Sequence, residues 1–168
     1  MANTYKAIAT VTVGSGGASS IEFTSIPSTY TDLIVKISTR DNRGGSQNGY
    51  FISINGSTSN FSAKQIQADG SSTPASFGIA RLIGYSPTTS GTASTFSNSE
   101  FYFPNYAGSN NKSISADAIQ ENNQTTAYIL VGAHLWSNTA AITSITFTPD
   151  TASFVQYSTA TLYGIKNS

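Results

Sequence analysis

The chain of 168 residues contains no cysteine, and its 8 basic and 8 acidic residues make up only 10% of the sequence. Without cysteine, disulfides, thiolate metal sites and thiol nucleophiles are excluded. Typical globular domains carry about 25% charged residues. Nucleic-acid binding relies on a basic face, and the only local basic cluster is Arg40 and Arg43 around Asp41. We therefore expect no nucleic acid among the partners.

Long apolar runs are also missing. No stretch approaches the roughly 18 consecutive apolar residues of a membrane span, and residues 1–10 contain no apolar core of a signal peptide. These absences predict a protein that is made in a cytoplasm, is not secreted and does not enter a membrane. No linker-like segment interrupts the sequence, so we expect a single domain over residues 1–168.

Histidine is nearly absent, since His134 is the only one. Every histidine-dependent triad or metal site must use it, but its apolar neighbours favour a hydrogen-bonded core or rim residue. No Gly-x-Ser-x-Gly sequence is present. Among the carboxylates, Glu100 is the best candidate for acid–base chemistry, although a solvent-facing strand residue is the favoured interpretation. We predict a non-enzymatic protein with no catalytic residue, no metal and no cofactor.

The residues that are present alternate with a period of two, which is typical of strands with one buried face. The run at 128–136 lacks polar alternation until His134, which predicts a central strand covered on both faces. Asn55-Gly56 predicts a type I′ hairpin turn. Signals are weak over 57–99, where we expect short strands and long loops. The other predicted strands cover residues 8–13, 21–23, 33–37, 50–54, 100–103, 114–119, 142–148 and 158–165.

No window carries an apolar stripe of helical period. The predicted fold is therefore all-β: an antiparallel β-sandwich, jelly-roll-like, with minimal helix. The residues expected in its core are Val11, Phe23, Leu33, Val35, Ile37, Ile52, Ile54, Phe101, Phe103, Leu130, Phe147 and Tyr163.

Aromatic side chains near loops are the best candidates for binding, because tyrosine offers flat amphipathic contact area to sugars and proteins. In the cluster 101–106, alternation buries Phe101 and Phe103 and exposes Tyr102, and it leaves Tyr106 in the following loop. Two amphipathic tyrosines at the rim of the sandwich are the simpler explanation. We take Tyr102, Tyr106, Arg40 and Arg43 as possible contacts to a partner or a glycan.

The two ends of the chain resemble a group of bacteriophage β proteins. The opening run from Thr10 to Pro27, with Tyr30-Thr31-Asp32-Leu33 after it, resembles the start of these proteins, and the stretch from Tyr157 to Ile165 looks like their closing strand. Such proteins are stand-alone virion components or terminal modules of tail fibres. The resemblance implies a structural role in the virion and transfers no catalytic motif.

Within that group, Met1 lies only a few residues before the first predicted strand, with no fibre shaft before it. This favours a capsid decoration, cement or head-fibre component, bound to phage structural proteins such as the major capsid or tail proteins. The alternative is a small tail-fibre or tail-tip protein that binds a host-surface glycan or receptor. Sparse charge and unprotected strand edges predict a homo-oligomer. The phage resemblance, with the three-fold sites common in phages, favours a trimer, while cyclic dimers are the commonest homo-oligomers in general.

Overall fold

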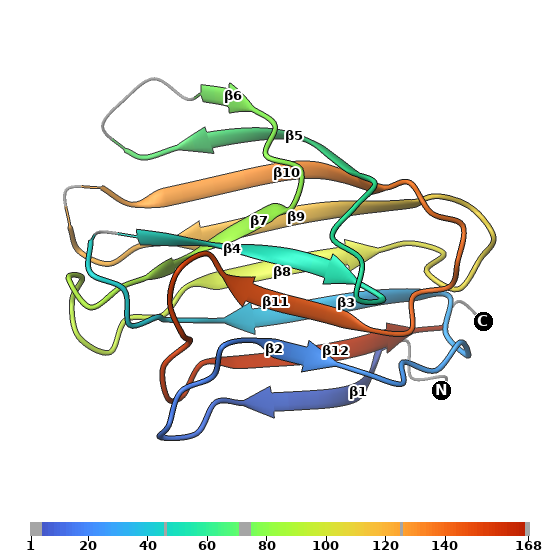
Figure 1. Ribbon diagram of the computed structural model, residues 1–168, viewed down its shortest axis with the longest axis horizontal. Coiled ribbons are helices and arrows are strands. Elements are labelled where there is room, and N and C mark those ends of the chain that lie inside the picture. Colours follow the sequence, from blue (N-terminus) through green and yellow to red (C-terminus); the bar gives the residue numbers. More distant parts are fainter. Residues whose placement is uncertain (1–4, 46, 71–74, 125, 167–168) are drawn as a thin grey trace.

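The computed structural model describes residues 5–45, 47–70, 75–124 and 126–166 (Figure 1). These residues contain twelve strands and no helix, and hence no helix that could cross a membrane. The strands are β1 (Tyr5–Thr12), β2 (Ile21–Phe23), β3 (Asp32–Ser38), β4 (Gln47–Ile54), β5 (Phe61–Ala68), β6 (Ala75–Phe77), β7 (Leu82–Pro87), β8 (Asn98–Phe103), β9 (Lys112–Gln120), β10 (Tyr128–Trp136), β11 (Ile145–Pro149) and β12 (Thr159–Ile165).

Two antiparallel sheets form a sandwich. The larger sheet has eight strands in the order β1-β12-β3-β8-β9-β10-β5-β6, and the smaller has four in the order β2-β11-β4-β7. Eight of the twelve strands, β1-β12-β3-β8 opposite β2-β11-β4-β7, follow the strand order of a jelly roll. The predicted all-β sandwich is confirmed, and its topology is that of a jelly roll with additions.

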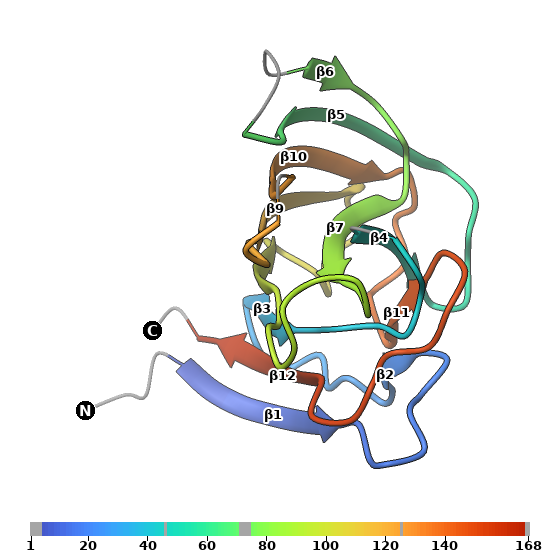
Figure 2. The ribbon, with the colours of Figure 1, turned by 90° about the vertical axis from the view of Figure 1, so that its left-hand side faces the viewer.

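The additions are two strand pairs inserted between strands of the jelly roll. The pair β5–β6 follows β4, and the pair β9–β10 follows β8; together they extend the larger sheet beyond β8. We call β9, β10, β5 and β6 the extension. Seen end-on, β5 and β6 rise beyond β7, which is the last strand of the smaller sheet (Figure 2).

Aromatic rings fill the jelly roll between the sheets. Phe101 of β8 stacks on Phe147 of β11 with ring centroids 5.4 Å apart, and Tyr50 of β4 meets both rings and Phe154 edge-on. All four side chains are fully buried. Edge-on and stacked contacts each add about 0.5–1.5 kcal/mol to the burial of such rings, so this cluster stabilises the packing of the two sheets.

The hairpin turn after β4 forms as its sequence predicts. Asn55 and Gly56 have φ values of 51° and 70°, the positive values that a type I′ turn requires at both central positions. The flanking residues Ile54 and Ser57 exchange backbone hydrogen bonds of 3.3 and 2.8 Å. The turn therefore fixes where β4 ends and the crossing to β5 begins.

Ten of the twelve predicted core residues are buried, and two are not. Val11 is partly buried against the core, because β1 is an edge strand of the larger sheet. Tyr163 points to the outer face, and its neighbour Leu162 occupies the core. In the sequence ATLYGI, either Leu162 or Tyr163 could be the residue that faces the core. The register with β3 places Leu162 opposite buried Val35, so Leu162 is buried.

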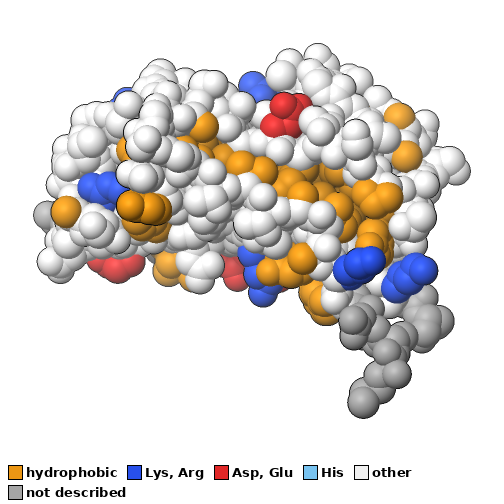
Figure 3. All heavy atoms as spheres, turned by 90° about the horizontal axis from the view of Figure 1, so that it is seen from below, with side chains coloured by type: hydrophobic (Ala, Val, Ile, Leu, Met, Phe, Trp, Pro, Cys, Tyr) orange, Lys and Arg blue, Asp and Glu red, His pale blue; other side chains and the backbone are white. Residues whose placement is uncertain are grey.

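The free edge at β1 carries protection against strand pairing. A β-bulge interrupts its register between Ala7 and Ala9, and exposed Lys6 lies just before it; bulges and lysines both discourage edge-to-edge association. Along this edge a band of hydrophobic side chains is visible between the sheets (Figure 3), where Ile8 and Val11 of β1 pack against the core. The expectation of an unprotected edge is thus wrong for β1.

Candidate interaction surface

The outer face of the extension carries a group of exposed aliphatic side chains. Ile66 of β5, Val131 and Ile129 of β10, and Ile119 of β9 are 60, 55, 50 and 43% exposed. The prediction that 128–136 is covered on both faces is therefore wrong, because β10 alternates buried and exposed residues along its length. We call Ile66, Ile119, Ile129 and Val131, with their neighbour Ala133, the aliphatic patch.

Strand register makes the patch continuous. Val131 lies opposite Ile66 on β5, and Ile129 lies opposite Ile119 on β9. Side chains of such cross-strand pairs are about 5 Å apart at Cβ and touch one another. A shallow hollow runs beside Ile66 and Val131, bordered by Lys64, Ser76 and Ala133. Contiguous apolar surfaces of this kind are typical of sites where proteins associate.

The inner face of the same strands buries polar side chains beside core residues such as Leu130 and Trp136. Gln65 of β5 and His134 of β10 are buried there, with Nε2 of Gln65 3.2 Å from Nε2 of His134. The reason is the segment from 78 to 82, whose backbone crosses this face: Gln65 donates to the carbonyl of Leu82 and accepts from Ile79 N–H at 3.3 Å. These side chains satisfy backbone groups that would otherwise be buried without partners.

His134 is part of that arrangement. Its Nδ1 is 3.4 Å from the carbonyl oxygen of Ala80, so Nδ1 carries the proton and Nε2 accepts from Gln65. Burial lowers the pKa of His134, an effect partly opposed by the Ala80 contact. Gly132 is required beside it, since a Cβ at that position would lie 2.6 Å from Nε2 of His134. The ring is thus a buried, neutral, hydrogen-bonded group, as its neighbours in the sequence suggest.

Next to the aliphatic patch, the outer face carries a short charged row. Nζ of Lys36 on β3 lies 3.1 Å from Oε2 of Glu100 on β8, and Glu100 pairs across the strands with Asp117 of β9. This is the one ion pair among the described residues, and its two side chains are 58 and 47% exposed. The hydrogen bond to Glu100 raises the pKa of Lys36. Acid catalysis by a carboxyl pair needs one acid held neutral by burial, and neither carboxylate is buried.

Two predicted contact residues are buried and hold loops together. The guanidinium of Arg40 donates to the carbonyl oxygens of Gly91, Thr92 and Thr95 at 3.2, 2.8 and 3.1 Å. Only 8% of Arg40 is exposed, so it orders the loop between β7 and β8. The hydroxyl of fully buried Tyr106 donates to the carbonyl of Pro27. Both residues are unavailable for contact in this structure, which corrects their predicted role.

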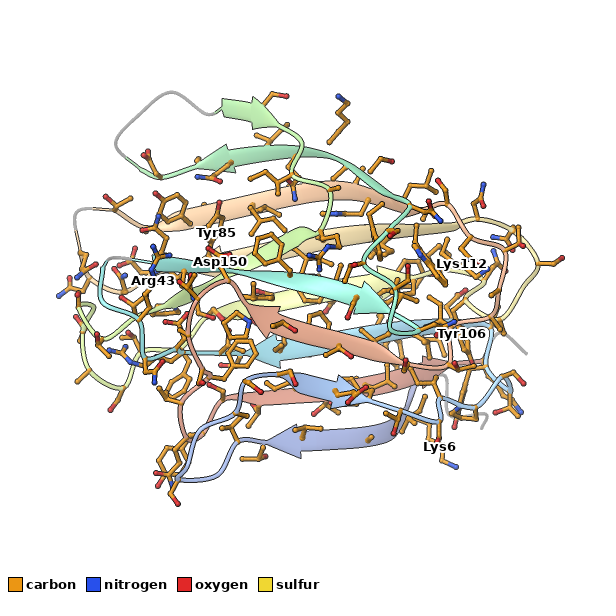
Figure 4. All side chains as sticks on the ribbon, in the orientation of Figure 1. Lys6, Arg43, Tyr85, Tyr106, Lys112 and Asp150 are labelled. Carbon is orange, nitrogen blue, oxygen red and sulfur yellow. The ribbon has the colours of Figure 1, made fainter. Side chains whose placement is uncertain are left out.

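The other two predicted contact residues remain at the surface but lie apart. Tyr102, half-buried on the outer face of β8, donates its hydroxyl to Oδ2 of Asp32 at 2.8 Å, which raises the pKa of Tyr102. Exposed Arg43 donates to Oδ1 of Asn48 at 2.9 Å. Figure 4 shows Arg43 at the end of the sandwich opposite to Tyr106. The four predicted residues therefore do not form one site.

Fully buried Asp41 belongs to the turn that places Arg43. Its Oδ1 accepts from the backbone N–H of Arg43 at 3.0 Å, and burial raises the pKa of the carboxyl. The hydrogen bond is that of an Asx turn, the role expected for an aspartate before two glycines. No group of three or more His, Cys, Asp or Glu side chains in the described part of the chain could hold a metal ion.

Sequence reasoning missed the aliphatic patch for a physical reason. On β5 the polar residues Gln65 and Gln67 alternate with Lys64, Ile66 and Ala68. Both sets contain polar residues, so the sequence does not predict which face of β5 is buried. On β10 both phases are apolar, which suggested burial on both sides. The alternation on β9, with small apolar residues inside and Ser115 and Asp117 outside, was the available signal for a half-exposed sheet.

Comparison with protein-family models, with curated proteins and with solved structures finds no match to this chain.

Proposed function

We propose that this protein is a non-enzymatic structural component of a bacteriophage particle, in the role of a capsid decoration, cement or head-fibre protein. The observation that carries the proposal is the resemblance of both chain ends to phage β proteins. The exposed aliphatic patch fits a protein that works in contact with other protein chains. Phage structural proteins such as the major capsid protein are the expected partners.

The chemistry of the polar groups supports a structural role. His134 is buried and engaged on both ring nitrogens, and the paired carboxylates Glu100 and Asp117 face solvent. A general acid or base near neutral pH needs an accessible group with a tuned pKa. The side chains that sequence analysis marked for catalysis thus stabilise the fold or lie on its surface.

The test is to locate the protein in particles of the phage that encodes it. Gradient-purified virions, separated into heads and tails, should contain the chain in a fixed ratio to the major capsid protein, and they should retain it in the head fraction. Absence from purified particles would contradict the proposal. Recovery with tails would instead support the alternative of a tail protein that binds a host-surface glycan, for which a glycan array is the direct assay.

Enzymatic activity is tested separately with polysaccharide, peptidoglycan and ester substrates. The wild-type protein should release no product. Turnover that Glu100→Gln abolishes in a folded protein would replace the structural proposal with a hydrolase.

A further inference from the structure

We infer that the aliphatic patch binds a second copy of this chain, face to face, about a two-fold axis that runs along β10. The inference does not depend on the phage assignment, because it rests only on the surface of the extension. Its evidence is the way in which apolar and charged residues are distributed on the three strands β9, β10 and β5.

The outward residues of β10 form an uncharged central row. Ile129, Val131, Ala133 and Leu135 follow one another along it, with Ile129 and Val131 at least half exposed. When a copy is turned over about an axis parallel to β10, this row faces itself. Apolar residues then meet apolar residues at the centre, as in the core of a stable interface.

The two flanking strands carry opposite charges. Lys64 is the only charged residue that points outward from β5, and Asp117 is the only one that points outward from β9. Both lie beside β10: Lys64 pairs with Ala133, and Asp117 pairs with Val131. One cation and one anion thus stand on opposite sides of the apolar row.

The two-fold axis brings the opposite charges of the two copies together. Turning a copy over about β10 places its β5 over β9 of the first copy, so its Lys64 lies over Ser115, the register partner of Ala133. Asp117 is the next outward residue along β9, about 7 Å away at about 3.4 Å per residue, within reach of a lysine side chain. The contact contains this pair twice, and Ile66 of each copy lies over the level of Asp117 on the partner, beside the partner's Val131.

Other modes of self-association fit the described surface less well than a face-to-face dimer. The β1 edge is guarded by Lys6 and a bulge, so pairing of strand edges is disfavoured there. A contact between identical faces closes with two copies, so the expected oligomer is a dimer and not the trimer suggested by phage symmetry. A dimer of this kind leaves the smaller sheet free for a further partner.

The first experiment measures the mass of the whole chain in solution by light scattering at micromolar concentration. The wild type should be a dimer. Val131→Glu should raise the dissociation constant at least tenfold, because it places two carboxylates against each other in an apolar contact. The matched control is Thr148→Glu, an exposed strand residue on the smaller sheet, which should leave the dimer intact. A wild-type monomer, a trimer, or equal effects of both variants would overturn the inference.

Charge exchange tests the two-fold geometry itself. Lys64→Glu and Asp117→Lys should each weaken the dimer, and the double variant should recover most of the lost affinity, because the pair is rebuilt with its signs reversed. Additive losses would contradict the proposed orientation. Circular dichroism on each variant separates loss of the contact from loss of the fold.

A cross-link provides a readout that does not depend on affinity. Because the chain has no cysteine, Val131→Cys creates a single thiol beside the proposed axis, where it faces its own copy. Mild oxidation should convert this variant to a covalent dimer, while Thr148→Cys stays uncross-linked under the same conditions. Equal cross-linking of the two variants would show random collision and reject the axis.

Discussion

The jelly roll and the extension use the same sheet in different ways. In the jelly roll, apolar and aromatic side chains such as Phe101 and Val35 point inward, and Lys36 and Glu100 point outward. In the extension, polar Gln65 and His134 lie beside apolar residues on the inner face, and aliphatic Ile66 and Val131 point outward. The larger sheet is continuous across this difference, since β8 pairs with β9.

The inner and outer faces of the extension differ from the jelly roll for separate reasons. On the inner face, Gln65 and His134 form hydrogen bonds with the backbone of residues 78–82, which crosses this face and would otherwise lack partners. Nothing comparable in the described chain covers the outer aliphatic residues. Folding of one chain therefore explains the inner face, and the proposed dimer contact is our explanation for the outer one.

The largest effect is expected in the aromatic core of the jelly roll. Phe147→Ala removes a fully buried ring that touches Tyr50 and Phe101, which should lower the free energy of unfolding by about 3–5 kcal/mol. Denaturant titration measures it. Thr148→Ala, on the same strand but facing solvent, is the control and should change stability by less than about 0.5 kcal/mol. Similar losses for both would mean that the two sheets are not packed through this ring.

The next prediction compares two neighbours on β10. Leu130 is fully buried and Val131 is 55% exposed, so Leu130→Ala should cost about 2–5 kcal/mol and Val131→Ala less than about 0.5 kcal/mol. Because the unfolding of a dimer depends on concentration, both variants are compared with the wild type at concentrations low enough for each protein to be monomeric. If Val131→Ala proved as costly as Leu130→Ala, the outer face of the extension would be covered within the chain itself.

Arg40 allows a smaller, more specific test inside the jelly roll. Arg40→Lys keeps the charge but loses the planar fork that reaches Gly91, Thr92 and Thr95 together. The expected loss is about 1.5–3 kcal/mol, with faster hydrogen exchange in the loop between β7 and β8. Arg43→Lys, at an exposed position of the next turn, serves as the matched control. If hydrogen exchange in the loop between β7 and β8 were the same in Arg40→Lys as in the wild type, Arg40 would not be the residue that orders this loop.

The sequence predicts the jelly roll much better than it predicts the extension. The strand at 50–54 alternates cleanly, because one of its faces meets a continuous apolar core, and its burial follows from the alternation. The extension defeats the same reasoning, since Gln65 is inside and Ile66 is outside. A hydrophobic pattern predicts which face of a strand is buried only when the apolar residues are buried within the same chain.

Two of the predicted contact residues, Arg40 and Tyr106, are buried for a related reason. Arg40 and Tyr106 have polar ends, which in sequence suggest surface, yet each side chain reaches backbone carbonyls of a distant loop. These carbonyls are separated from Arg40 and Tyr106 by more than 50 residues in the chain. Such partners are defined only by the tertiary fold, so alternation within residues 101–106 could not indicate them.

The smallest effect concerns pH and tests whether His134 is neutral because of the polar inner face. Burial lowers the pKa of His134 in the folded protein, while the unfolded chain keeps a value of about 6.5. On acidification the unfolded state binds the proton first, so stability is complete above about pH 6.5 and falls as the pH decreases toward the folded pKa. His134 is the only histidine, which makes the window between about pH 7.5 and 5.5 specific for it. The melting temperature of the wild type should decline across this window relative to that of His134→Gln. Parallel profiles for the two proteins would mean that the ring titrates equally in both states and that its contacts with Gln65 and Ala80 do not hold it neutral.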